Sequence, residues 1–151
     1  MRLTRLMSAA LAVAAVAGVV ACGSDALSSP TDPNLAIPGA VLGSYGLLTI
    51  NGQPLPAETR HDAAGTASVT GGVLTLGGGT FFQNLTVSET TAAGQTTSRT
   101  SGTQGSFSMR GEQIHFQGSD GGSWDGTWAG NRIAYSITGN NGPVTFVFIR
   151  T

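Results

Sequence analysis

The sequence predicts an all-β fold, a single antiparallel up-and-down β-barrel of about eight strands. Glycine accounts for 23 of the 151 residues and only 10% of the residues are charged, a composition typical of strands and turns. From about residue 40 onward apolar and polar residues alternate, and Gly or Asn recurs roughly every eight to twelve residues. Because an open meander leaves two exposed edges, this pattern favours closure into a barrel.

The N-terminal residues form a predicted export signal. Arg2 and Arg5 precede an apolar run over residues 6–21. At roughly 16 residues, the run is shorter than the ~20 residues that a membrane-spanning helix needs, and it is typical of the core of a signal peptide. We therefore expect residues 1–21 to be a signal-peptide helix that is absent from the mature chain.

The end of the apolar run carries a lipid-attachment motif. Val19, Val20 and Ala21 precede Cys22, the single cysteine, and this series resembles the lipobox of bacterial lipoproteins. The resemblance implies cleavage before Cys22 and lipidation of its thiol with acyl chains such as palmitate. Because more than one acyl chain gives stable anchoring, we expect a lipid-anchored protein of the bacterial cell envelope. The expected location is the outer membrane, facing the periplasm or the cell surface.

Residues 22–40 are predicted to be a disordered, flexible tether. Pro30 and Pro33 lie in a stretch of Ser, Thr, Asp and Asn that has no apolar periodicity. Such a segment cannot bury enough apolar surface to offset the entropy of ordering it. The tether therefore separates the membrane from a predicted β-barrel domain at residues 41–151.

The domain begins with one clear strand and one irregular one. Residues 44–50 alternate and end at Asn51-Gly52, a strong turn signal because both residues tolerate positive φ. Residues 58–70 are polar and poorly patterned, which predicts at most one irregular strand with a bulge or break at Gly65.

The central part of the domain combines short strands with a polar hairpin. Residues 73–76 predict a short strand, and residues 80–88 predict a second strand after a glycine turn. Three apolar residues share one face of that second strand: Phe81, Leu85 and Val87. Residues 90–105 are rich in Thr and Ser, which predicts a hairpin with paired flanks and an exposed tip near Gly94, or a flexible loop.

The final third contains a repeated hairpin and an apolar last strand. Residues 105–116 and 126–135 each have the pattern of strand, tight turn and strand. Residues 143–150 are apolar on both faces, which favours a central or covered position in the sheet.

Several of these segments resemble one family. Residues 43–56 contain Gly-x-Tyr-x-Leu, then Asn-Gly, then Leu-Pro. With the repeated Gly-Thr-Trp and Gly-Ser-Phe hairpins and the closing strand, they resemble small lipocalin-like bacterial lipoproteins over residues 43–150. The resemblance implies a small up-and-down barrel and implies no activity. The chain departs from true lipocalins because Tyr45 replaces the Trp of their Gly-x-Trp motif.

Composition argues against several classes of protein. A net charge of −1 without lysine argues against nucleic-acid binding, because neutralising phosphates needs a basic face. One cysteine excludes a disulfide framework and a four-cysteine zinc site. A transmembrane barrel is disfavoured because several predicted strands are shorter than about nine residues. We expect no metal and no cofactor.

No group of residues predicts catalysis, and we do not expect an enzyme. His61-Asp62 is the one adjacent acid–base pair, and a solvated loop is its simplest interpretation. A Gly-x-Ser-x-Gly nucleophile elbow is absent from the sequence. Asp120 and Asp125 supply too few oxygens for calcium and favour a turn. His115 alternates with apolar neighbours and is expected on the exposed face of a strand.

Two functions for the domain remain open. The first is a non-catalytic binder of a small hydrophobic ligand, in a pocket lined by large inward-facing side chains. The candidate pocket residues are Tyr45, Leu47, Phe81, Phe107, Phe116, Trp124, Trp128, Tyr135 and Phe146. Among them, Trp124 and Trp128 flank Gly126, either as barrel core or as a stacking wall for an apolar or sugar ligand. The second function is a structural or protein-interaction lipoprotein with a filled barrel and an unidentified protein partner.

Overall fold

The structure is a computed structural model that describes residues 36–139 and 142–151. The predicted signal peptide, Cys22 and most of the predicted tether lie outside these residues. Within them, no helix is long and apolar enough to cross a membrane. The elements are η1 (a 3-10 turn, Gly39–Val41), β1 (Gly43–Ile50), β2 (Gln53–Pro54), β3 (Ala57–Asp62), β4 (Gly65–Gly77), β5 (Thr80–Thr91), β6 (Thr96–Arg110), β7 (Gln113–Gly118), β8 (Ser123–Ala129), β9 (Arg132–Gly139) and β10 (Gly142–Arg150).

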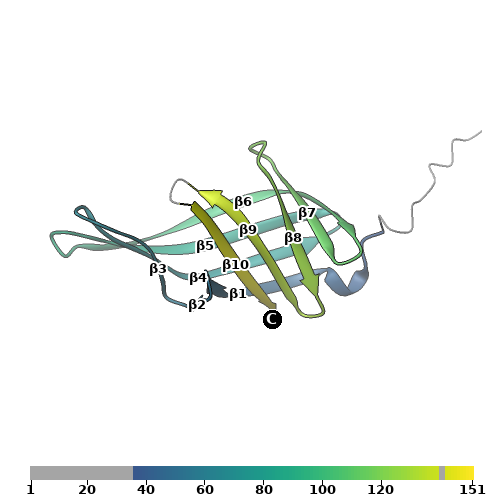
Figure 1. The fold of residues 1–151 in the computed structure, drawn as a ribbon, viewed down its shortest axis with the longest axis horizontal. Helices are drawn as coiled ribbons and strands as arrows, with labels where there is room; N and C mark the ends of the chain where they lie inside the picture. Colours follow the sequence, from purple (N-terminus) through teal and green to yellow (C-terminus); the bar gives the residue numbers. More distant parts are fainter. Residues whose placement is uncertain (1–35, 140–141) are drawn as a thin grey trace, which may run out of the picture. The chain divides into compact units, whose positions relative to one another are not determined.

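Eight of the strands close into an antiparallel barrel, which confirms the predicted fold class (Figure 1). Each strand from β4 to β10 pairs with the next, β10 pairs with β1, and β1 pairs back with β4. The closing ladder runs from Gly43 opposite Leu76 to Gly46 opposite Val73. The strands β2 and β3 are additional to the barrel, because each pairs with only one neighbour.

Residues 58–70 differ from their prediction. They form most of a hairpin in which β3 pairs with the first half of β4, and residues 73–76 are the second half of that same 13-residue strand. The register shifts between Val69 and Gly71, so a bulge joins the two halves. Gly65 is the predicted break and not a bulge, because β3 ends at Asp62 and β4 begins at Gly65. It has φ +134° at the hairpin end, and a Cβ there would lie 2.0 Å from the carbonyl oxygen of Thr90.

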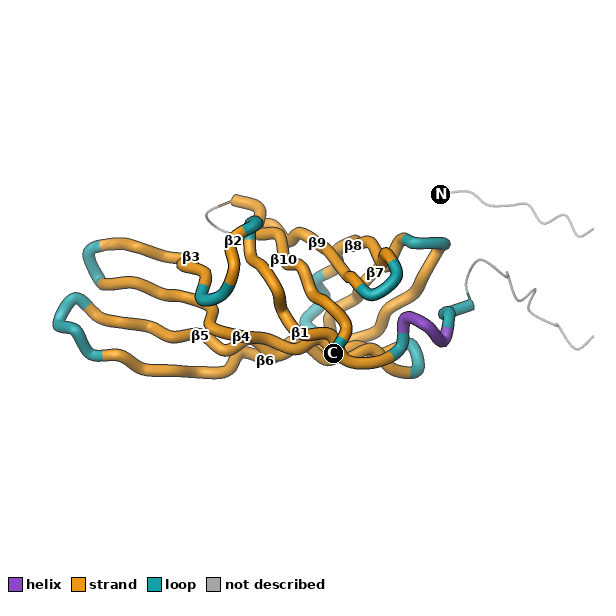
Figure 2. The backbone as a smooth tube through the Cα atoms, turned by 90° about the horizontal axis from the view of Figure 1, so that it is seen from below, coloured by secondary structure: helices purple, strands orange, loops and turns teal. Residues whose placement is uncertain are grey.

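The strands β4, β5 and β6 continue beyond the barrel and form, with β3, a sheet that we call the extension. It comprises β3, residues 65–70 of β4, 86–91 of β5 and 96–104 of β6 (Figures 1 and 2). The predicted hairpin over residues 90–105 is confirmed as its outer half. Its tip contains Gly94, which has φ +80° and donates a hydrogen bond to the Thr91 carbonyl.

Aromatic side chains fill the barrel interior. Phe81 meets Phe116 edge-on, with centroids 5.2 Å apart and an interplanar angle of 85°. Tyr135 stacks on Phe146 at 5.4 Å and 29°. Such pairs contribute about 0.5–1.5 kcal/mol each beyond the area that they bury. The barrel interior is therefore a packed core, to which inward-facing residues of every barrel strand contribute.

The N-terminal segment seals one end of the barrel, which we call the closed end. Val41 is fully buried and accepts a 2.7 Å hydrogen bond from the Tyr45 hydroxyl. The Arg150 guanidinium donates to the carbonyls of Ala40 and Leu42. Ile37 packs on the core from within the span predicted as tether. The opposite end, from which the extension projects, is the open end.

Candidate functional site

The strands β8 and β9 separate at the open end. Their pairing begins at Ala129 opposite Arg132 and stops at Gly126 opposite Tyr135. Beyond that point β8 follows β7, whereas β9 follows β10 through residues 136–139. The turn before β8 is also held toward β6, because the Ser119 amide donates to the Gln104 carbonyl at 2.8 Å. The two strands therefore diverge, as Figure 1 shows.

A cleft of about 580 Å³ lies where these strands diverge. One wall is the start of β8, the other is the end of β9, and the far side is formed by β5 and β6. Its lining residues are Gln83, Thr103, Asp120, Gly122, Ser123, Trp124, Asp125, Tyr135, Ser136, Ile137 and Thr138. The volume falls within the range of about 300–1,000 Å³ that is usual for small-molecule sites.

The deepest polar groups of the cleft are Tyr135 and Gln83. The Tyr135 hydroxyl donates a hydrogen bond to Oε1 of Gln83, and Gln83 is only 7% exposed. Burial raises the pKa of the Tyr135 hydroxyl well above its ordinary value, and the bond to Gln83 offsets part of that rise. Tyr135 is therefore a neutral phenol at neutral pH. The Tyr135 hydroxyl occupies the side-chain carbonyl of Gln83. Gln83 therefore offers its amide N–H groups to a ligand.

Trp124 is the aromatic wall of the cleft. Its ring stacks on Phe116, with centroids 5.6 Å apart and planes at 17°. The indole Nε1 is buried and has no hydrogen-bond partner among the described residues, as is also true of Trp128. A buried donor without an acceptor costs about 1–3 kcal/mol. Trp124 lines the cleft and Trp128 does not.

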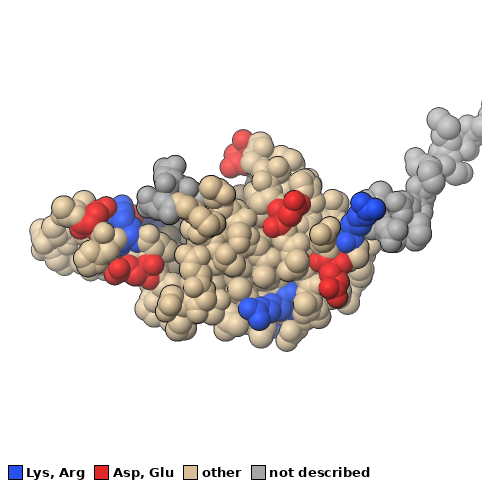
Figure 3. Space-filling model, in the orientation of Figure 1, with Lys and Arg blue, Asp and Glu red and all other residues tan. Residues whose placement is uncertain are grey.

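The rim of the cleft is polar and acidic. Asp120 accepts a 3.0 Å hydrogen bond from the Gly122 amide, as expected for a turn. Asp125 lies 2.7 Å from Nδ1 of His115. Among the described residues there is no group of three or more side chains that could hold a metal ion. The face drawn in Figure 3 carries few charged side chains, and these are scattered.

The structure separates the candidate pocket residues into two groups. Trp124 and Tyr135 line the cleft. The others contact one another in the core, and Phe81 also borders a hollow of about 420 Å³ formed with Phe82 and Gln104. Gly126 leaves no open slot between the two tryptophans, because a Cβ there would lie 2.9 Å from the Tyr135 Cβ.

Sequence reasoning missed Gln83, although a signal for it exists. It lies on the inward-facing side of β5 between Phe81 and Leu85, where an apolar residue would be expected. A polar residue at an inward position indicates a buried hydrogen bond or a binding site.

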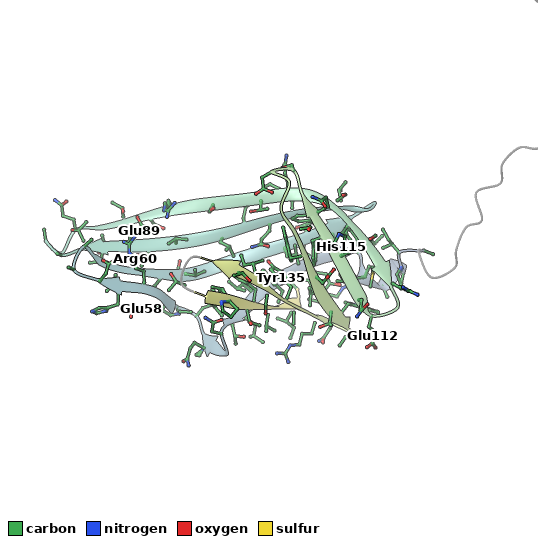
Figure 4. All side chains as sticks on the ribbon, turned by 45° about the horizontal axis from the view of Figure 1, so that its top comes forward. Glu58, Arg60, Glu89, Glu112, His115 and Tyr135 are labelled. Atoms are coloured by element: carbon green, nitrogen blue, oxygen red, sulfur yellow. The ribbon has the colours of Figure 1, made fainter. Side chains whose placement is uncertain are left out.

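Figure 4 shows Tyr135 within the barrel and Glu58, Arg60 and Glu89 on the extension.

The two histidines lie at the surface. His61 is on β3, 3.5 Å from Glu58, and its side chain is 73% exposed. Ser108, His115 and Asp125 are opposite one another on β6, β7 and β8. The side chains of His115 and Asp125 are exposed to water, so the contact between them contributes little to stability. For Ser108, His115 and Asp125 to act as a nucleophilic site, hydrogen-bond donors for an oxyanion would also be needed beside them.

Comparison with models of protein families, with curated proteins and with solved structures finds no match to this chain.

Proposed function

We propose that the chain is a lipid-anchored envelope lipoprotein whose lipocalin-like barrel binds a small, mainly hydrophobic ligand in the lateral cleft, without catalysis. The cleft beside Trp124, with Tyr135 and Gln83 at its floor, is the observation that carries the proposal. Because the interior is filled by aromatic side chains, the ligand lies at the entrance between β8 and β9 and does not enter the barrel core.

The lining favours a neutral molecule with an apolar ring and one hydrogen-bond acceptor. The ring would pack against Trp124 and Ile137, and the acceptor would meet the Gln83 amide. The carboxylates of Asp120 and Asp125 disfavour an anion, since the lining residues include no basic side chain.

The segment that leads into the barrel and the cleft lie at opposite ends of the barrel. Residues 37–42 approach the closed end, whereas the cleft is at the open end. A lipid on Cys22 would hold the protein at the outer membrane, facing the periplasm or the cell surface.

The test uses Nile red, a neutral planar fluorophore with a carbonyl acceptor, and the full-length chain. We expect saturable one-to-one binding that weakens at least tenfold in Trp124→Ala. Trp128→Ala is the matched control, because its indole N–H is also buried without a partner but lies outside the cleft. Equal losses in both variants, with far-ultraviolet circular dichroism preserved, would contradict binding at the cleft.

The filled interior also favours a second candidate, a structural or protein-interaction lipoprotein that works through its surface. The core side chains of Phe116, Phe148 and Ile133 are fully buried. The absence of any Nile red binding by the folded chain would support this function over ligand binding.

A further inference from the structure

One edge of the extension carries unused backbone hydrogen-bonding groups. Residues of β6 from Thr96 to Gln104 pair with β5 on one side. On the other side β7 begins its pairing only at Gly105. The amide of Ser119 binds the Gln104 carbonyl, so within the described chain no strand covers the edge from Thr96 to Thr103. In Figure 2 this edge is the lower boundary of the extension.

The β6 edge has none of the features that usually protect an exposed strand. Its ladder with β5 continues from Thr80 opposite Ser106 to Thr90 opposite Thr96 without a register shift. It contains no proline and no lysine. Its one charged residue, Arg99, is paired with Glu89 of the neighbouring strand at 3.0 Å. Proteins commonly protect edges with bulges, charges, proline or short length, and a long regular edge without them is a template for another strand.

The opposite edge of the same sheet is protected. The strand β3 has only six residues, and its register with β4 shifts between Glu58 and Arg60. His61 and Asp62 add further titratable side chains to this edge. The contrast within one sheet indicates that the open β6 edge is a specific feature, since the other edge is protected by its short length, its register shift and its polar side chains.

We propose that β6 of one copy of this chain pairs antiparallel with β6 of a second copy across a two-fold axis. A register that places Thr100 opposite its symmetry mate sets Arg99 opposite Ser101, so the two arginines do not face each other. Thr100 then faces its symmetry mate and Thr97 faces Thr103 across the new ladder, and such Thr pairs are favourable. Because each outer edge of the joined sheet is a protected β3, assembly stops at the dimer.

The choice of a second copy follows from the symmetry and neutrality of the edge. The same short side chains would lie on both sides of the axis, and each Arg99 is already neutralised within its own copy. The contact is made mainly by backbone groups and is small, so we expect a dimer that depends on concentration. Lipid anchoring would raise the local concentration of the chains and favour it.

The first test is disulfide cross-linking of the full-length chain in detergent. We expect Thr100→Cys to form a covalent dimer on mild oxidation. The control is His61→Cys, which places an exposed thiol on the β3 edge. Both variants retain Cys22, so its contribution is the same in each. Equal cross-linking in the two variants would overturn the proposal.

The second test measures mass by sedimentation as a function of concentration. The wild-type chain is expected to reach twice its monomer mass, and the Ser98→Lys, Thr100→Lys double variant is expected to stay monomeric with an unchanged melting temperature. Lysines at Thr59 and His61 of β3 provide the matched control and should leave the dimer intact. A wild-type chain that is monomeric throughout would overturn the proposal and leave the edge to a strand of a different protein.

Discussion

The hydroxyl of Tyr135 on β9 donates a hydrogen bond to Oε1 of Gln83 on β5, 52 positions away in the chain. Both side chains are buried, and both line the cleft. The bond crosses the barrel at the level where β9 loses its pairing with β8. It therefore holds β9 against the opposite wall at the place where the ladder no longer does, and it forms the floor of the proposed ligand site.

Loss of this bond is expected to destabilise the fold. Tyr135→Phe leaves the Gln83 carbonyl without its partner, which should lower the free energy of unfolding by about 1–3 kcal/mol. Urea denaturation measures the change. The Gln83→Leu, Tyr135→Phe double variant should lose less than the sum of the single variants, because neither polar group remains. Additive losses would show that the two side chains are not coupled.

Stability is expected to fall in alkaline solution. Burial disfavours the tyrosinate, so the Tyr135 pKa is higher in the folded chain than its ordinary value of about 10 in the unfolded chain. The protonated phenol thus contributes stability that is complete below about pH 10 and declines as the pH rises further, because only the unfolded chain releases the proton. Urea midpoints from pH 8 to about 11.5 measure this decline. In Tyr135→Phe the decline should be smaller, and an equal decline would contradict the assignment to Tyr135.

Gly126 is expected to tolerate no side chain. In Gly126→Ala the added Cβ would lie 2.9 Å from both the Ala134 carbonyl oxygen and the Tyr135 Cβ. The resulting overpacking should cost about 1–3 kcal/mol, measured by thermal or urea unfolding. Gly71→Ala is the control, since nothing lies within 4 Å of a Cβ there. Similar losses in both variants would argue against close packing at Gly126.

Arg150 is expected to hold the N-terminal segment on the closed end. Arg150→Ala removes the donors to the Ala40 and Leu42 carbonyls. Amide hydrogen exchange at residues 39–43 should accelerate, while exchange in β5 and β9 should change little. Arg132→Ala, at the same end of the barrel, is the matched control. Acceleration throughout the barrel in Arg150→Ala would instead assign the residue a global role in stability.

The barrel could be predicted from sequence because its strands are amphipathic. Alternation marks one face of each strand as core, and Asn51-Gly52 adopts the positive φ values that the turn signal implies. The extension could not be predicted in this way, because both faces of its β3 and β6 segments are exposed apart from Ala57 and Thr103. The bulge between Val69 and Gly71 also breaks the period of β4, so one long strand has the pattern of two.

The candidate site was predictable only in part. Trp124 and Tyr135 stand out as large inward-facing residues, and both line the cleft. The cleft itself depends on where β8 and β9 stop pairing, a long-range relationship that leaves no local pattern. Gln83 was missed because polar residues on alternating strands are normally assigned to the exposed face, whereas its position between Phe81 and Leu85 is an inward one.

Native mass spectrometry of the full-length chain, purified from a bacterial host and released from detergent, tests ligand binding most directly. We expect a small-molecule adduct at one per chain that disappears on denaturation, is absent from Trp124→Ala and is retained by Trp128→Ala. A wild-type chain that stays free of adduct after incubation with lipid and hydrophobic-metabolite extracts would contradict a binding function. It would favour a filled barrel that acts through its surface.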